Sequence, residues 1–295
     1  MEQSEIRQKA ERYLAVEKDS QFRQEVENLL KSQDFDELGD RFYTELAFGT
    51  GGLRGVIGGG FNRMNPYIVQ RATQGLANYI KKHRHSEQAS VVIAYDSRRF
   101  SGRFALQAAC VLAANGIKAF LFTGLRPTPE LSFAVRQLKA IAGIVLTASH
   151  NPPEYNGYKV YWEDGGQIVP PQDRAIVNEV YAVREIARVE ENGARDRGLL
   201  EYIDTEIDGP FIQLVCSLSL RPGLIKEKGH ELTAVYTPLH GAGRMPLVAA
   251  LEKMGISVTL VPEQQEPDGD FPTVSSPNPE DPAAMKCALE LAQNT

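Results

Sequence analysis

The sequence predicts an α/β protein with a three-layer α/β/α domain on a mainly parallel mixed sheet, an incomplete second α/β domain and an N-terminal helical extension. Short apolar runs alternate with amphipathic segments from residue 90 onward, and the alternation begins again near residue 204. The first forty residues are polar and carry apolar residues at helical spacing. We therefore divide the chain into residues 1–40, 41–200 and 201–295.

The N-terminal segment is expected to form polar amphipathic helix. Ile6, Ala10 and Tyr13 recur at helical intervals, and Phe22 and Val26 continue the pattern. Because charged residues separate these positions throughout, we expect an appendage to the core rather than part of it.

A glycine-rich segment, FGTGGLRGVIGGG, spans residues 48–60. Glycine tolerates positive φ and lets the backbone approach a ligand closely, so we expect a loop with that capacity. The next segment begins with Pro66, which is tolerated in a first helical turn, and places Ile68, Ala72 and Leu76 on one face. A helix is predicted there.

The first α/β unit contains three continuous apolar runs separated by helical patterns. Strands are expected at 91–95, 117–122 and 141–146, helices at 102–114, 129–138 and 171–188, and a hairpin at 165–166. Such strands indicate a parallel sheet covered on both faces, whose ligands gather at the carboxyl ends of the strands. Residues 96–98, 128–129 and 149–150 follow these ends and are expected to converge on one crevice.

The second unit shows only two convincing strands, at 232–236 and 256–261. Helices are expected through Phe211 and Leu218, at 244–254 and from Pro282. Two strands are fewer than an open sheet usually needs. We therefore expect an exposed apolar edge and self-association.

Composition restricts the classes of partner. The chain has 295 residues and a formal net charge of -6 without a long basic block, which gives no support for nucleic acid or an anionic membrane as partner. We expect neither a signal peptide nor a membrane span, because the N-terminus is charged and no eighteen apolar residues run together. That expectation favours a cytoplasmic location. The three cysteines are far apart, which predicts reduced thiols.

The segment TASHNPPEYNGYKVY, residues 147–161, carries the chemistry, and its composition allows three interpretations. It is typical of a plain turn. The pair Ser149 and His150 suggests a hydrolase, but neighbours on extended backbone point to opposite sides and the G-x-S-x-G elbow is absent. A serine that carries a phosphoryl group needs cationic donors, which Lys159 and Arg54 could supply. Arg54 could instead pin a loop, and Arg98 is expected to bond Asp96 or a turn carbonyl.

The same segment resembles the phosphoserine loop of the α-D-phosphohexomutase superfamily over its whole length. Weaker markers follow the order of that family, namely FGTGGLRG at 48–55, YDSR at 95–98, PTPE at 127–130 and TPLHG at 237–241. The N-terminal helix and the segments at 64–65 and 73–76 are similar to the bacterial phosphoglucomutase and phosphopentomutase-like branch.

The resemblance implies a mutase that moves phosphate between hydroxyls of a phosphorylated hexose or pentose. Ser149 would carry the phosphate, and a sugar 1,6-bisphosphate would act as intermediate and activator. Lys159 would be the general acid/base or a phosphate partner. The remaining implied site residues hold the phosphoserine or the substrate: His150, Arg54, Thr50 and Arg98. Mg²⁺ is expected for the family, with an oxygen of phosphorylated Ser149 as one ligand.

The family's metal loop, Asp-x-Asp-x-Asp followed by Arg, has no full counterpart. The string PDGDF at 267–271 lacks the third aspartate and the arginine, and the later sugar and phosphate loops are not found. We therefore expect a truncated or split mutase whose partner is the missing C-terminal half. The alternatives are a catalytically incompetent fragment and a phosphosugar-binding or regulatory module.

Overall fold

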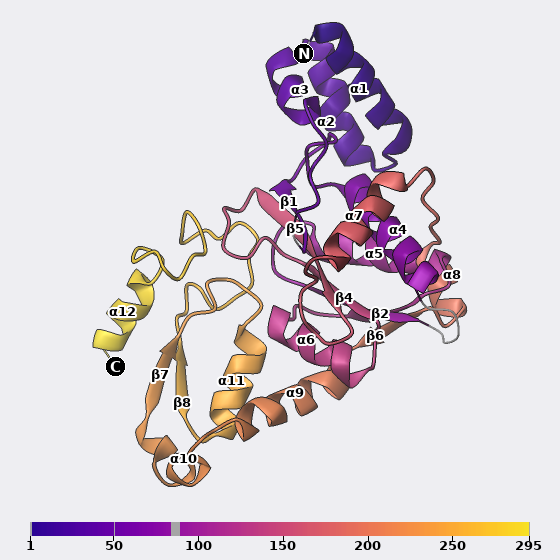
Figure 1. Cartoon of the computed structure of the whole chain (residues 1–295). Helices are drawn as coiled ribbons and strands as arrows, with labels where there is room; N and C mark the ends of the chain where they lie inside the picture. Colours follow the sequence, from indigo (N-terminus) through magenta and orange to yellow (C-terminus); the bar gives the residue numbers. More distant parts are fainter. Residues whose placement is uncertain (1, 50, 84–88, 295) are drawn as a thin grey trace.

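The N-terminal extension is a unit of three helices. The computed structural model describes residues 2–49, 51–83 and 89–294, and its first helices are α1 (Gln3–Val16), α2 (Ser20–Ser32) and α3 (Phe35–Phe42). Asp19 and Asp34 cap α2 and α3 by accepting backbone N–H groups of the first turn. The three helices enclose an apolar core that Phe61 completes, and Phe22 of α2 is buried in the core of the first α/β unit, so this segment is more than a polar appendage. Figure 1 shows it at one end of the molecule.

The first α/β unit is built on a six-stranded sheet in the order β1-β5-β4-β2-β3-β6. The strands are β1 (Gly52–Val56), β2 (Ser90–Tyr95), β3 (Lys118–Phe122), β4 (Ala142–Leu146), β5 (Tyr155–Trp162) and β6 (Leu200–Ile203). Strand β5 runs antiparallel to β1 and β4, whereas the pairs among β4, β2, β3 and β6 are parallel. The predicted mixed, mainly parallel sheet is confirmed.

Helices cover both faces of this sheet, which gives the predicted three layers (Figure 1). The helices of this unit are α4 (Pro66–His83), α5 (Ser101–Ala114), α6 (Thr128–Gln137), α7 (Gln172–Ala182) and α8 (Glu191–Asp196). Residues of α4, α5 and α7 share one buried cluster with Val91 and Ile93, and residues of α6 share the other with Val92 and Ala94. Both faces of β2 are therefore buried, which explains its continuous apolar run.

Three strands were not predicted. Strand β1 lies inside the glycine-rich segment, where Gly52 permits close pairing: a Cβ there would lie 2.1 Å from the Tyr158 carbonyl oxygen. Strand β5 begins in the polar motif, and β6 begins at Leu200, where we expected a boundary. The helix predicted to reach residue 188 ends at Ala182. The three-unit division stays a prediction. Its second boundary, between residues 200 and 201, falls inside β6, which pairs with β3.

The second unit holds α9 (Thr205–Ser217), α10 (Pro222–Lys228), a short 3₁₀ turn (Gly229–Glu231), β7 (Thr233–Tyr236), α11 (Arg244–Lys253), β8 (Ser257–Leu260) and α12 (Lys286–Gln293). The two strands predicted for this unit are present as β7 and β8, which form a separate parallel pair. Helix α9 packs against α11 and also against α6 of the first unit. It therefore connects the two units.

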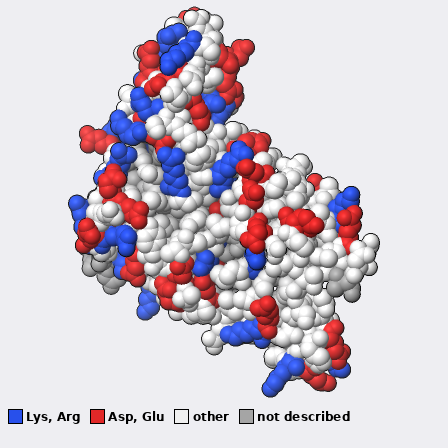
Figure 2. Space-filling model, turned by 180° about the vertical axis from the view of Figure 1, so that it is seen from behind, with Lys and Arg blue, Asp and Glu red and all other residues white. Residues whose placement is uncertain are grey.

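The surface is mixed in charge. On the face shown in Figure 2, acidic and basic side chains are interspersed. Among the described residues, no helix combines the length and the apolar character that crossing a membrane requires.

Candidate active site

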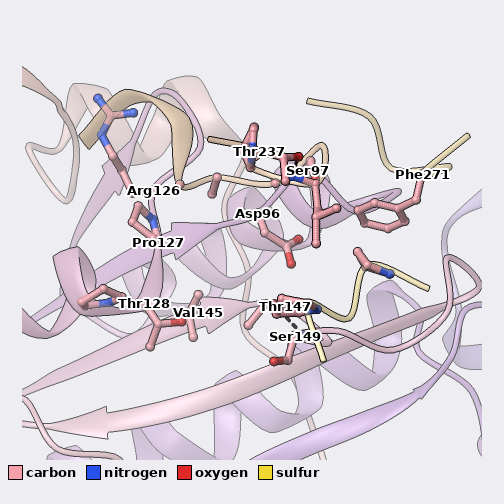
Figure 3. A pocket seen from close by; sticks show the side chains of 18 of the residues that line it. Asp96, Ser97, Arg126, Pro127, Thr128, Val145, Thr147, Ser149, Thr237 and Phe271 are labelled. Carbon is pink, nitrogen blue, oxygen red and sulfur yellow. Dashed lines mark hydrogen bonds between the residues drawn. The ribbon is translucent and has the colours of Figure 1, made fainter. Parts of the chain in front are cut away.

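A cavity of about 410 Å³ opens where the first sheet faces the second unit. Its walls come from the carboxyl ends of β2 and β4, from the residues before and at the start of α6, and from the segment that follows β7 (Figure 3). Its lining includes Asp96, Arg126, Thr147, Ser149 and Phe271. The predicted convergence on one crevice is confirmed for Asp96, Thr128 and Ser149.

Ser149 lies exposed on the loop between β4 and β5, residues 147–154, which we call the serine loop. Its backbone has φ 58°, a left-handed conformation that is uncommon for serine. The conformation is held locally, because the Ser149 N–H donates to the Thr147 hydroxyl oxygen over 2.9 Å. The Thr147 hydroxyl also bonds the carboxylate of Asp96. The nucleophile candidate is thus fixed by a chain of side-chain hydrogen bonds.

His150 is close to the serine hydroxyl, contrary to the sequence argument. Its Nδ1 lies 3.5 Å from Ser149 Oγ, at the long limit of hydrogen bonding. An extended backbone would send the neighbouring side chains of Ser149 and His150 to opposite sides. The positive φ of Ser149 breaks that alternation and brings both side chains to the same side.

Arg98 supports the serine loop from beneath. Its side chain is fully buried, and its terminal nitrogens donate to the carbonyl oxygens of Ser149 at 2.9 Å, Asn151 at 2.5 Å, Pro152 at 2.9 Å and Tyr155 at 3.0 Å. Its Nε lies 3.5 Å from an Asp96 carboxylate oxygen. This placement agrees with the turn-carbonyl alternative. It argues against direct contact between Arg98 and a substrate phosphate.

Arg54 and Lys159 project from the same face of the sheet. Arg54 pairs with Gly157 and Gly52 pairs with Lys159, so alternation puts both cations on one side while Tyr158 is buried on the other. Arg54 is exposed and its Nη1 donates to the Asn151 side-chain oxygen over 3.2 Å. Burial and then the like charge of Arg54 lower the pKa of Lys159.

Sequence reasoning under-weighted two residues of this site. Asp96 was expected only at the crevice or as a partner of Arg98, and Thr147 was assigned no contact, although the carboxylate of Asp96 points into the cavity (Figure 3). Burial raises the pKa of Asp96, while hydrogen bonds from Thr147, the Arg98 backbone and Ser101 oppose that rise. The position of Asp96 directly after β2 was the available signal. Thr50, the remaining predicted phosphate contact, lies outside the described residues.

A second polar cluster lies behind the cavity wall. The Arg126 guanidinium, which is 9% exposed at the residue level, forms a two-point contact with the Asp208 carboxylate at 2.7 and 2.8 Å. The Glu130 carboxyl is fully buried beside them, 3.9 Å from Arg126 Nε, and its two oxygens have no hydrogen-bond partner among the described residues. Burial, then Asp208, raise the pKa of Glu130 to about 8. This cluster joins α6 to α9 and thereby the two units.

The described residues do not fit a divalent-metal site. Among them, no group of three or more His, Cys, Asp or Glu side chains could hold a metal ion. Asp270, the second aspartate of the PDGDF string, is paired with Arg99, and the carboxylate of Asp96 is occupied by Arg98, Ser101 and Thr147. A magnesium ion requires several oxygen ligands in octahedral arrangement, which these residues do not offer. We therefore derive no step through a metal.

Comparison with known proteins agrees with this geometry. Residues 45–187 match the family model for phosphoglucomutase/phosphomannomutase alpha/beta/alpha domain I, and residues 211–295 match the model for domain II. A phosphoglucomutase of Staphylococcus saprophyticus is 38% identical over 275 residues, which are 92% of this chain and 48% of the relative. A phosphoribomutase of Saccharomyces cerevisiae is 37% identical over 289 residues, which are 92% of this chain and 46% of the relative.

A solved structure extends the comparison to the fold. The crystal structure of a protein from Thermus thermophilus that is assigned as a phosphomannomutase superposes with a TM-score of 0.69 at 31% identity. The match covers 84% of this chain and 52% of the other. The chain thus spans about half the length of the relatives it matches. Both family models and these relatives show that the chain belongs to the α-D-phosphohexomutase superfamily, the family of phosphoglucomutases and phosphomannomutases.

Proposed function

We propose that this chain is the phosphoserine-bearing part of a phosphosugar mutase, with Ser149 as the phosphate carrier. The observation that carries the proposal is the placement of Ser149: exposed on a left-handed turn and at the wall of a 410 Å³ cavity. Its loop is further supported by Arg54, which binds Asn151. A serine loop held by internal hydrogen bonds suits a group that must be phosphorylated and dephosphorylated without rearrangement.

In the proposed reaction, a sugar hydroxyl attacks phosphorus of phosphorylated Ser149. The new P–O bond forms in line with the breaking bond to Ser149 Oγ, and the hydroxyl proton passes to a base while Ser149 Oγ recovers a proton. The resulting sugar bisphosphate then returns its other phosphate to Ser149. Lys159, whose pKa is lowered, supports the proton transfer, and Arg54 and His150 hold the phosphoryl oxygens.

The substrate class in this proposal is a phosphorylated hexose or pentose. The relatives include a phosphoglucomutase and a phosphoribomutase, whose names cover both sugar classes. A sugar 1,6-bisphosphate would prime Ser149. Mg²⁺ stays an expectation from the family, with a phosphoserine oxygen as its contact to this chain. We also place the chain in the cytoplasm, a proposal that rests on its three free cysteines.

Phosphorylation of Ser149 tests the proposal. We expect incubation with glucose 1,6-bisphosphate to add one phosphoryl group to the intact mass of the chain, and we expect Ser149→Ala to prevent the addition. Multiple turnover of glucose 1-phosphate should be slight without a partner, because positioning and charge neutralisation are the main sources of rate in this chemistry. Binding of the sugar without phosphorylation would instead favour a binding or regulatory module.

A further inference from the structure

A segment of the second unit lies directly on the support of the serine loop. We call this segment, residues 267–276, the latch. Its turn at Gly269 packs against the backbone after β2: a Cβ on Gly269 would lie 2.7 Å from both the Arg99 nitrogen and the Ser97 oxygen. Because backbone atoms do not yield easily, only glycine fits at this contact. The latch and the polypeptide that carries Arg98 are therefore in close backbone contact.

Phe271 completes the surroundings of the Arg98 guanidinium. The ring is 3% exposed, and its centroid lies 5.1 Å from Arg98 Cζ. The edge of the same guanidinium is used by the carbonyl oxygens of the serine loop, among them Ser149 O. A cation against an aromatic face is stabilised most where water is excluded. The Phe271 ring thus covers the planar face of the Arg98 guanidinium, while the N–H groups at the edge of the guanidinium donate to the serine loop.

Ser276 gives the latch a direct bond to the serine loop. Its hydroxyl donates to the carbonyl oxygen of His150 over 2.5 Å. The acceptor belongs to the residue that follows the nucleophile. The latch therefore contacts the loop both through Arg98 and at His150.

The second unit holds the latch firmly. The buried His240 ring faces the Glu266 carbonyl oxygen through Nδ1 at 3.0 Å and the Thr273 hydroxyl through Nε2 at 2.9 Å. Since a carbonyl only accepts, Nδ1 carries the proton and Nε2 accepts from Thr273. The Asp268 N–H also donates to the His240 carbonyl oxygen over 3.1 Å. The latch must move with the unit that contains His240.

We propose that the latch makes the geometry of the phosphoserine loop depend on the second unit, with Phe271 as a positioning residue that acts through Arg98. This inference rests on the proposed function of Ser149. When the latch is seated, the Ser149 carbonyl is fixed and the hydroxyl faces the cavity. When it is unseated, Arg98 loses its aromatic cover and the loop loses its bond at His150.

Amide hydrogen exchange of the full chain tests the positioning without reference to activity. Phe271→Leu keeps an apolar side chain but removes the aromatic face. We expect exchange in residues 147–154 to accelerate by about five-fold in this variant, while exchange in β2 and β3 stays at the wild-type rate. Phe271→Tyr, which keeps the aromatic face, should stay within about two-fold of wild type. The matched control is Phe42→Leu, which alters a buried ring of the N-terminal extension that packs on Tyr13 and Phe61, away from the junction of the two units.

The rate of Ser149 phosphorylation by glucose 1,6-bisphosphate provides the second measurement. Phe271→Leu should lower the maximal rate by about ten-fold and leave the half-saturating concentration of glucose 1,6-bisphosphate unchanged. Phe271→Tyr should keep the wild-type maximal rate. Unchanged exchange in residues 147–154 of Phe271→Leu, or equal acceleration in Phe42→Leu, would overturn the latch proposal. Absence of phosphorylation in the wild-type chain would overturn the proposed function alone, because the exchange measurement still decides on the latch.

Discussion

Lys159 is the residue whose removal should most affect proton transfer. Its half-buried amine has a lowered pKa and lies beside Arg54 on the face of the sheet that carries the site. We expect Lys159→Met to slow phosphorylation of Ser149 by glucose 1,6-bisphosphate by about 100-fold, the usual size of a general acid/base contribution. The time course of intact mass measures this rate. Recovery of the rate in Lys159→Arg would show a purely electrostatic role, because arginine does not release its proton.

Arg54 should set the pH dependence of the same step. Its positive charge disfavours protonated Lys159 and so lowers the pKa of that amine, after burial. Arg54→Gln removes the repulsion, so the pKa rises and the rising limb of the pH–rate profile should move to higher pH. Initial rates of Ser149 phosphorylation measured from mildly acidic to alkaline pH would show the shift. A lower rate with an unmoved midpoint would assign Arg54 to phosphate binding only.

Glu130 should make the folded state less stable as pH rises. Burial raises its pKa to about 8, so the folded chain retains a proton that the unfolded chain loses near the ordinary value of 4.5. Between these values, stability should fall with pH by at most about 1.4 kcal/mol per pH unit. Glu130→Gln removes the titration and should flatten this part of the profile. Urea unfolding at about pH 5, 6.5 and 8 measures the slopes, and parallel slopes in both proteins would contradict the assignment.

At the residue scale, the sequence identified Ser149, Arg54 and Lys159, and the structure places all three at one end of the sheet. The expectation that Arg98 bonds Asp96 or a turn carbonyl agrees with the structure, but the sequence could not say which carbonyls accept, because they belong to residues more than fifty positions away. The sequence argument also put His150 on the side away from the Ser149 hydroxyl, whereas the two side chains lie on the same side. The error came from the backbone of Ser149, since a positive φ at a serine has no reliable sequence signal.

At the element scale, the apolar strands β2, β3 and β4 were predictable because both of their faces are buried. Strands β1 and β5 were not, because glycine and polar residues interrupt them. Gly157 shows the reason: a Cβ there would lie 2.6 Å from the Thr147 oxygen and 2.8 Å from the Leu53 oxygen. Close backbone approach requires glycine in strands that a propensity scale reads as turns.

The junction between α2 and the glycine-rich segment should depend on Gly59. A Cβ at this position would lie 2.4 Å from the Phe22 carbonyl oxygen and 2.8 Å from a Val26 methyl. Its N–H donates to the Glu25 carboxylate over 2.9 Å. We expect Gly59→Ala to lower the free energy of unfolding by about 1–3 kcal/mol, the usual cost of overpacking. Chemical denaturation followed by circular dichroism measures it.

Gly223 provides the control for that substitution. It lies in α10 with open space around the position of a Cβ, so Gly223→Ala should leave the free energy of unfolding unchanged or raise it by up to about 1 kcal/mol. Equal losses in the two variants would indicate a general effect of losing glycine. A loss confined to Gly59→Ala would show that α2 and the glycine-rich segment are in contact in solution.

At the scale of the whole molecule, the alternation of strands and helices along the chain predicted two α/β units, but not how the two units contact each other. Their junction is both polar and apolar. Arg126, Glu130 and Asp208 lie where α6 meets α9, and Phe133 packs on Phe211. Gly269 and Phe271 of the latch contact residues 97–99, which support the serine loop. These contacts depend on single residues from distant segments, so no local pattern announces them. The cavity forms between units, which is why its far wall was not predicted.

The second unit also exposes apolar side chains, which should produce weak self-association. Leu218 and Leu220, between α9 and α10, are 69% and 96% exposed, and Leu232, directly before β7, is 56% exposed. Each leucine buried between two copies would contribute about 2 kcal/mol, against a substantial entropic cost of association.

We expect the sedimentation coefficient of the chain to rise with protein concentration in the micromolar range. The double variant Leu218→Lys, Leu220→Lys should sediment as a monomer at the same concentrations, because burying a lysine carries a desolvation cost. Val169→Lys in the first unit, where the valine is 60% exposed, is the matched control. If that control abolished association equally well, the surface beside β7 would not be the contact, and added positive charge alone would explain the effect.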